Sequence, residues 1–226
     1  MTFKWCSVRM NDGRVGIGNI HEERKTKVTK VYFVRHAEPV HAHADDRTRP
    51  LTTEGLEDIK IVLETLKDKR IDVFYCSPYV RSMATIEEAA GFFDKEIITD
   101  ERLREREKGN EGNSSGNVLK MRWADFSFHE EGGESIGMVQ ERNMAALREI
   151  LAANEGKNIV IGTHGTALSS ILNYYNPQFN CDDFLRIVDW MPYIIELDFE
   201  GDKCVGMREH AYVEKKFPER MASFKK

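Results

Sequence analysis

The chain has 226 residues, of which 41% are apolar and 31% charged, with a formal net charge of −5. This composition is typical of a globular protein with a buried core, and it excludes a disordered chain, a collagen-like fibre and a disulfide-rich miniprotein. No apolar run approaches the roughly 20 residues of a membrane helix, and no signal peptide is expected at the start. Lysine and arginine are concentrated at the two ends, so the middle is acidic. We therefore expect no membrane and no nucleic-acid partner.

The four cysteines, Cys6, Cys76, Cys181 and Cys204, lack the Cys-x-x-Cys spacing of a zinc site or a redox motif. Cys76 ends an apolar run, which favours a buried structural thiol. Reduced cysteines and the absence of an export signal indicate a cytoplasmic protein.

Three segments differ in character along the chain. Residues 1–27 look like an N-terminal appendage, in which Asn11-Asp12-Gly13 predicts the turn of a hairpin. Residues 28–212 form the predicted main domain, and residues 213–226 form a basic C-terminal tail.

Within the main domain, apolar runs typical of buried strands alternate with the apolar periodicity of helices. In chain order the pattern predicts a strand at 30–34, a helix at 53–66, a strand at 71–76, helices at 80–93 and 135–153, a strand at 158–162, a helix at 167–175 and paired strands at 193–199 and 203–210. In the first helix the expected buried stripe is Leu56, Ile59, Val62, Leu63 and Leu66. Residues 94–133 show no regular pattern. The alternation predicts a three-layer α/β/α sandwich around a mostly parallel sheet.

Polar side chains follow three of the predicted strands. Arg35 and His36 follow the first, Arg81 begins the helix after the second, and His164 follows the third. The carboxyl ends of parallel strands meet at one edge of a sheet, so these side chains are expected to converge. A cation in the first turn of a helix opposes the helix dipole, which suggests that Arg81 faces an anion.

These residue types suit phosphoryl transfer. Arginine binds phosphate oxygens with its planar fork, and a neutral imidazole can attack phosphorus. A second histidine can stabilise the transferring group if it is protonated, in which case a carboxylate is expected beside His164. A carboxylic acid, with Glu105 and Glu107 as candidates, can protonate the leaving oxygen. No metal is needed for this chemistry.

Six short motifs occur in an order that resembles the histidine phosphatase superfamily, also called the phosphoglycerate mutase-like family. They are Arg35-His36-Ala37-Glu38, Leu51-Thr52-Thr53-Glu54-Gly55, Ser77-Pro78-Tyr79-Val80-Arg81, Leu103-Arg104-Glu105, Gly132-Gly133-Glu134-Ser135 and Thr163-His164-Gly165. The first departs from the usual Arg-His-Gly-Glu by its alanine. The resemblance extends from about residue 30 to about residue 199 and implies a phosphoglycerate mutase-like fold.

The resemblance also implies roles for individual residues. His36 would be the phosphorylated nucleophile, and Glu105, favoured over Glu107 by the Leu-x-Glu spacing, would be the proton donor. The phosphoryl group would be held by Arg35, Arg81 and His164, with Glu134 and Thr166 as further phosphate-binding candidates. The implied activity is hydrolysis of a small phosphomonoester through a phosphohistidine, with no cofactor and no metal.

Two other functions stay open. A mutase would pass the phosphoryl group to another hydroxyl, but family mutases that act on phosphoglycerate carry Glu-Arg-His-Tyr-Gly where this chain reads Glu105-Arg106-Glu107-Lys108-Gly109. A non-catalytic module that binds a phosphorylated ligand would have no use for a proton donor.

Several features of the loops are less specific. His41, His43, Asp45 and Asp46 could suggest a metal site, but their loose spacing favours a solvated loop. We expect Arg104 and Arg106 to be solvated, and either Arg47 or Arg49 to reach the substrate. The aromatic group of Trp123, Phe126 and Phe128 is either a lid or a satellite core. Specificity is expected in loops 39–50 and 108–130, and the oligomeric state is left open.

Overall fold

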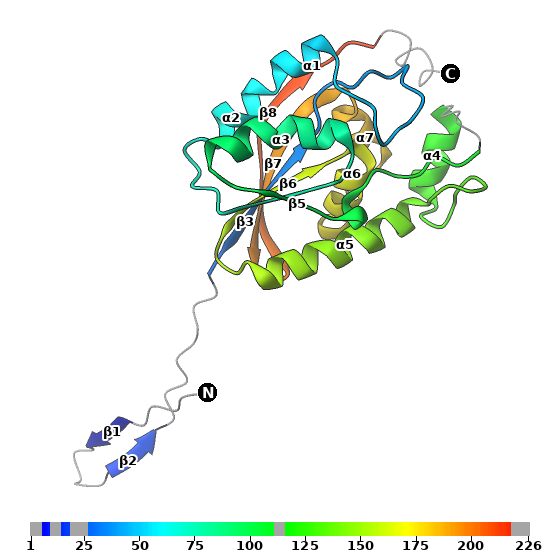
Figure 1. The fold of residues 1–226 in the computed structure, drawn as a ribbon. Helices are drawn as coiled ribbons and strands as arrows, with labels where there is room; N and C mark the ends of the chain where they lie inside the picture. The colour runs from blue at the N-terminus through cyan, green and yellow to red at the C-terminus, as the bar shows by residue number, and fades with distance from the viewer. Residues whose placement is uncertain (1–5, 10–14, 19–26, 111–115, 218–226) are drawn as a thin grey trace.

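A six-stranded sheet with the order β5-β4-β6-β3-β7-β8 forms the centre of the protein (Figure 1). The computed structural model describes residues 6–9, 15–18, 27–110 and 116–217. The strands of the sheet are β3 (Thr29–Arg35), β4 (Val73–Cys76), β5 (Ile97–Thr99), β6 (Asn158–Thr163), β7 (Trp190–Glu200) and β8 (Lys203–Glu214). Neighbours among β5, β4, β6 and β3 are parallel, and β7 and β8 are antiparallel to their neighbours. The predicted mostly parallel sheet is confirmed.

Helices cover both faces of this sheet, which makes the three predicted layers (Figure 1). One face carries α1 (Thr53–Asp58), α2 (Lys60–Leu66) and α3 (Val80–Phe92), and the other carries α5 (Ile136–Ala153) and α6 (Gly165–Tyr175). Successive side chains of β3 point to opposite faces of the sheet, and each face has its own hydrophobic core. Tyr32 and Val34 pack in the core on the first face, and Val31 and Phe33 pack in the core on the second. Two further helices are α4 (Gly116–Ala124) and α7 (Cys181–Ile187).

The structure differs from the predicted elements in five places along the chain. The single helix expected at 53–66 is divided at Ile59 into α1 and α2. Leu56, expected in the buried stripe, is 52% exposed, whereas Val62 and Leu66 are buried. The sequence did not predict β5, α4 and α7, and β8 continues to Glu214.

The N-terminal segment contains β1 (Cys6–Arg9) and β2 (Val15–Gly18), which pair antiparallel as the predicted hairpin requires. The predicted turn at residues 11–13 lies outside the described residues. At the other end, Lys215 forms ion pairs with Glu38 at 3.1 Å and with Asp58 at 2.5 Å, so the start of the predicted tail contacts the main domain.

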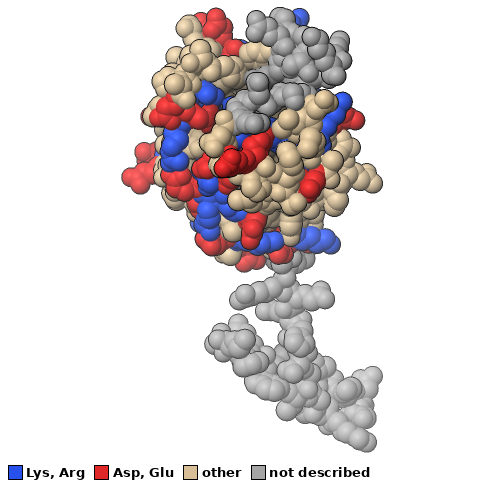
Figure 2. Space-filling view, turned by 90° about the vertical axis from the view of Figure 1, so that its right-hand side faces the viewer, with Lys and Arg blue, Asp and Glu red and all other residues tan. Residues whose placement is uncertain are grey.

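The surface carries charges of both signs. On the face drawn in Figure 2, acidic and basic side chains of the described residues are interspersed. Ion pairs such as Arg102–Glu149 and Arg186–Glu209 account for part of this mixing. Among residues 27–110 and 116–217, no helix is both long and apolar enough to span a bilayer.

The carboxyl ends of three adjacent strands bring the predicted motifs together. Backbone hydrogen bonds join His36 N–H to the Thr163 carbonyl (3.1 Å) and Ser77 N–H to the Gly162 carbonyl (3.0 Å). The turn after β3 is braced by Gly55, where a Cβ atom would lie 2.4 Å from the Glu38 carbonyl oxygen. Only glycine permits that approach, which accounts for the glycine in the second motif.

Candidate active site

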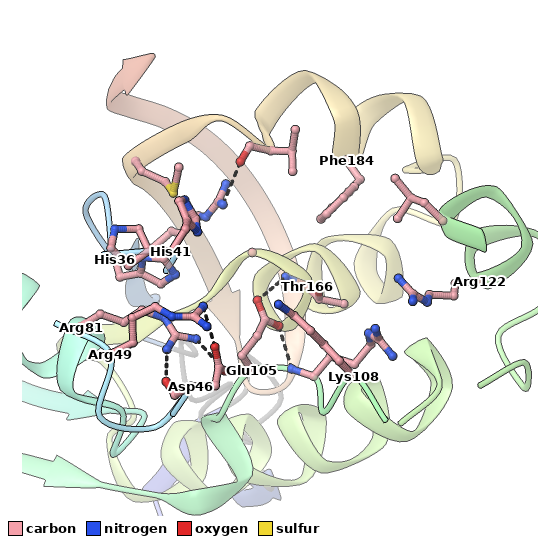
Figure 3. Close-up of a pocket in the computed structure, with 17 residues that line it drawn as sticks. His36, His41, Asp46, Arg49, Arg81, Glu105, Lys108, Arg122, Thr166 and Phe184 are labelled. Carbon is pink, nitrogen blue, oxygen red and sulfur yellow. Dashed lines mark hydrogen bonds and ion pairs between the residues drawn. The ribbon is translucent and has the colours of Figure 1, made fainter. Parts of the chain in front are cut away.

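A pocket of about 220 Å³ opens at this edge of the sheet. Its polar lining contains more basic than acidic side chains, namely Arg35, Arg49, Arg81, Arg106, Lys108 and Arg122 against Asp46 and Glu105. In Figure 3, His36 and Arg81 lie on one side and Arg122 and Phe184 on the other, with Glu105 between them. The surplus of positive charge makes the pocket suitable for an anionic ligand.

His36 lines the pocket at the end of β3 and is only 5% exposed. Its Nδ1 lies 2.7 Å from the Ala37 carbonyl oxygen. A carbonyl can only accept, so Nδ1 carries the proton and Nε2 of the neutral ring keeps its lone pair. Burial, and then the charges of Arg81 and Arg35, hold the pKa of His36 well below its usual range. His36 therefore lines the pocket as a neutral ring with a free lone pair on Nε2.

His164 lies directly beside His36, with ring centroids 5.3 Å apart in an edge-to-face arrangement. The ring is fully buried and is not part of the pocket lining. His164 Nε2 lies 2.7 Å from the Ser77 hydroxyl, and not beside the carboxylate that a charged ring would require. Burial, followed by the charge of Arg81, lowers the pKa of His164 well below its usual range. The ring is therefore neutral, and its Nδ1 has no hydrogen-bond partner in the described part of the chain.

Arg35 is positioned by the end of α7. It donates through Nη1 to the Ile187 carbonyl at 2.7 Å and through Nη2 to the Val188 carbonyl at 2.8 Å. A guanidinium group at a helix C-terminus satisfies carbonyls that lack a partner in the helix. A Cβ atom on Gly165 would lie 3.3 Å from the guanidinium carbon, so the glycine after His164 leaves room for Arg35.

Arg81 is 2% exposed and already has an anionic partner. It donates to the Asp46 backbone carbonyl and, through Nη2, to Asp46 Oδ2 at 3.2 Å. The other carboxylate oxygen pairs with Arg49 Nη1 at 2.7 Å. A loop carboxylate thus bridges two pocket arginines, as a phosphate would. Of the two arginines left open by the sequence, Arg49 lines the pocket, whereas Arg47 pairs with Glu101 outside it.

Glu105 lines the pocket and is fixed by backbone N–H groups. Its carboxylate accepts from Arg106 N–H (2.8 Å), from Thr166 N–H (3.1 Å) and from Ala167 N–H (3.2 Å). Two of these donors belong to the first turn of α6, where free N–H groups favour an anion. Glu107, the competing acid, is 52% exposed and pairs with Arg104. The geometry thus favours Glu105 and also places Thr166 in the pocket wall.

Glu134 and the arginines near it are placed differently from the predictions. Glu134 does not line the pocket, since it is 6% exposed and pairs with Arg104 and Arg142 at 2.8 Å each. Arg106, expected to be solvated, is also 6% exposed, and Arg104 is partly buried in its ion pair. The buried carboxylates, Glu130 beside Arg106 and Glu134 beside Arg104, lie more than twenty residues further along the chain, so no local pattern could reveal these two pairs.

The far end of the pocket contains residues that the sequence did not single out. Arg106 and Arg122, each 5% exposed in the side chain, share the single carboxylate of Glu130. Burial lowers the pKa of Arg106, and Arg122 Nε has no hydrogen-bond partner in the described residues. The apolar part of the pocket lining includes Leu119, Phe184, Val188 and Met191.

The loop around His43 and the aromatic group around Trp123 make contacts within the protein. Residues 27–110 and 116–217 contain no group of three or more His, Cys, Asp and Glu side chains placed to hold a metal ion. His43 instead contacts the Thr48 hydroxyl, and Asp45 accepts from the same hydroxyl. Trp123 is 9% exposed and contacts Phe126, Phe179 and Phe184, so Trp123 and Phe126 are part of the core, whereas Phe128 is partly exposed.

The two neutral histidines predict a pH dependence of stability. The unfolded chain protonates these rings near pH 6.5, whereas the folded protein resists protonation of His36 and His164 until well below that pH. The free energy of unfolding is therefore expected to fall as pH decreases below 6.5, by up to about 1.4 kcal/mol per pH unit for each ring. Urea unfolding between pH 7.5 and 5.5 measures the slope. His36→Asn should reduce the slope and substitution of the exposed His129 by Asn should not; equal slopes in both variants would contradict the assignment.

Sequence comparisons identify a family whose model matches most of the chain. The model of the histidine phosphatase superfamily (branch 1) matches residues 31–207. The chain is 29% identical over 168 residues to a 2,3-bisphosphoglycerate-dependent phosphoglycerate mutase of Parvibaculum lavamentivorans, across 67% of this chain and 80% of that protein. It is 27% identical over 150 residues to phosphoserine phosphatase 1 of Hydrogenobacter thermophilus, across 61% and 71% of the two chains.

Solved structures share the fold. A mycobacterial glucosyl-3-phosphoglycerate phosphatase superposes with a TM-score of 0.68 at 16% identity, across 84% of this chain and all of that one. A phosphoserine phosphatase of Entamoeba histolytica in complex with phosphoserine gives 0.65 at 20% identity, across 81% and 96% of the chains. These matches confirm the predicted phosphoglycerate mutase-like fold.

Proposed function

The chain belongs to the histidine phosphatase superfamily, and on that premise we propose that it is a phosphatase that hydrolyses a small phosphomonoester through a phosphohistidine on His36. The observation that carries this proposal is the hydrogen bond from His36 Nδ1 to the Ala37 carbonyl, which leaves the Nε2 lone pair available. Arg35, Arg81 and Glu105 line the same pocket. A nucleophile, phosphate ligands and a proton donor are thus present together.

In the first step His36 Nε2 attacks phosphorus, a P–N bond forms, and the P–O bond to the leaving group breaks. Arg35 and Arg81 bind the phosphoryl oxygens, which requires the substrate to replace Asp46 on Arg81. Glu105, protonated when the substrate binds, gives its proton to the leaving oxygen. The buried Nδ1 of His164 would gain a partner from a phosphoryl oxygen.

In the second step water attacks the phosphohistidine. Glu105, now a carboxylate, takes a proton from the water as the P–N bond breaks. Inorganic phosphate leaves and His36 returns to its neutral form. No step requires a metal ion, and we propose that the reaction is metal-independent.

We propose that the substrate carries a second anionic group. Arg106 and Arg122 share one carboxylate, so one buried positive charge at the far end of the pocket has no ion pair of its own among the described residues. Burying an uncompensated charge is costly, and a ligand anion would remove that cost. The Entamoeba histolytica phosphoserine phosphatase named above binds phosphoserine, a small phosphorylated acid, which supports this substrate class for the present chain.

Replacement of Arg122 by methionine tests the second anionic group. We expect KM for a phosphorylated carboxylic acid to rise about 10- to 100-fold, because a charge-assisted hydrogen bond contributes roughly 1.5–3 kcal/mol. KM for 4-nitrophenyl phosphate, which has no second anion, should change less than about threefold. Lys120→Met, on the exposed side of the same helix, is the control. Equal increases for both esters would argue against an anion subsite at Arg122.

Phosphate release from a panel of phosphomonoesters, in the presence of EDTA, tests the proposed reaction. Release that persists with EDTA supports a metal-independent phosphatase, and release that EDTA abolishes contradicts metal independence. The same incubations, analysed for phosphoryl transfer between hydroxyls, identify a mutase. Binding of inorganic phosphate without turnover of any ester would favour the non-catalytic module.

A further inference from the structure

Arg142, on α5, uses every N–H donor of its guanidinium group. Nε and Nη2 donate to the two carboxylate oxygens of Glu134, both at 2.8 Å. Nη1 donates to the backbone carbonyls of Arg102 and Arg104, both at 2.7 Å, and Nη2 also donates to the Glu105 carbonyl at 3.1 Å. An arginine side chain has five N–H donors, so none is left over.

The acceptors of Arg142 belong to the segment that presents Glu105, residues 102–109, which we call the acid loop. Glu105 follows a short 3-10 helix (Glu101–Leu103) and lies in no helix or strand of its own. Carbonyls at the end of such a helix need donors from elsewhere. Glu134 adds two contacts, because its carboxylate also accepts from the Arg104 side chain at 2.8 Å and from Glu107 N–H at 3.0 Å. The loop is thus held at the backbone on both sides of Glu105.

We propose that Arg142 is the positioning residue of Glu105, holding the backbone of the acid loop so that the carboxylate stays at one place in the pocket. This inference rests on the proposed function of Glu105. Arg142 does not line the pocket, so it acts through Glu105 and not on the substrate. Proton transfer needs the acid within hydrogen-bond reach of the leaving oxygen, and small displacements are costly.

The dependence on the leaving group separates positioning from general support of the fold. Nitrophenolate leaves with little protonic assistance, whereas an alkoxide needs the acid. For Arg142→Gln we expect the burst of phosphoenzyme formation to slow about 10²-fold with an alkyl phosphate and less than about threefold with 4-nitrophenyl phosphate. Arg148→Gln, on the same helix and bonded to the Tyr174 hydroxyl, is the matched control. Equal slowing with both esters, or no slowing with either, would overturn the proposal.

Arg142→Lys provides a second variant in case the glutamine variant does not fold. Lysine keeps the charge but loses the planar fork, so it cannot reach three carbonyls and a carboxylate together. We expect it to fold and to slow the alkyl ester selectively, by less than the glutamine variant. Wild-type rates with both esters would overturn the proposal.

Hydrogen exchange of residues 102–109 gives a readout that needs no catalysis. Loss of the Arg142 contacts should make these amides exchange at least about tenfold faster, while β3 and β6 stay protected. Unchanged exchange of the acid loop would overturn the positioning role. A wild-type protein that forms no phosphoenzyme would instead overturn the proposed function, so the two failures are distinguishable.

Discussion

Replacement of His36 by alanine is expected to abolish phosphoenzyme formation and to lower phosphate release by about 10⁴- to 10⁶-fold, because the covalent route is lost with the nucleophile. The side chain is nearly buried and makes its only described polar contact with the Ala37 carbonyl, so the fold should survive. The measurement is retention of radioactive phosphate on the protein after an alkaline quench, which preserves phosphohistidine.

His43→Ala is the matched control, since His43 lies in the neighbouring loop and its ring contacts the Thr48 hydroxyl at 3.0 Å. It should retain the label and the activity. Label that persists on the His36→Ala protein would place the phosphoryl group on another residue. Loss of activity in the His43→Ala protein would support a metal ion bound in the loop that contains His43.

Replacement of Glu105 by glutamine is expected to slow turnover by about 10²- to 10⁴-fold, the usual contribution of a general acid or base. Glutamine keeps the shape of the side chain and one accepting oxygen but cannot exchange a proton. With 4-nitrophenyl phosphate the first step should survive and the second should fail, so that phosphoenzyme accumulates. Rapid-quench measurement of the labelled protein over time tests this expectation.

Glu107→Gln is the control, because Glu107 has the same chemistry, lies two residues away and is 52% exposed. We expect a change of less than about threefold for this variant. If the Glu107 variant lost more activity than the Glu105 variant, the proton donor would be Glu107. If phosphoenzyme did not accumulate in the Glu105→Gln protein, Glu105 would not be the base of the hydrolysis step.

The sequence was sufficient to predict the centre of the site. His36, Ser77 and His164 follow adjacent strands, and the parallel arrangement of those strands dictates that their ends converge. A run of apolar residues is a strong local signal of a buried strand, so β3, β4 and β6 could be predicted from the local sequence alone.

The rest of the pocket depends on contacts between distant segments. In the sequence Arg106 resembles a solvated loop residue, and only the fold brings Glu130 beside it. Arg142 resembles an ordinary polar residue of an amphipathic helix, and only the fold brings the acid loop against it. The sequence also suggested a charged His164, because the neutral Ser77 hydroxyl that faces it becomes visible only in the fold. The apolar part of the pocket lining comes mainly from α4 and α7, two helices that the sequence did not predict.

The position of β3 in the sheet has a consequence for synthesis. This strand, which ends in Arg35 and leads directly to His36, pairs on one side with residues 158–163 and on the other with residues 193–199. A ribosome must therefore make more than 120 further residues before the strand meets either partner. Until then an apolar strand with two open edges remains on the nascent chain, where it can associate with other chains or recruit a chaperone. The candidate active site is thus assembled late, and a chain that stops before residue 158 can protect neither the strand nor His36, which follows it.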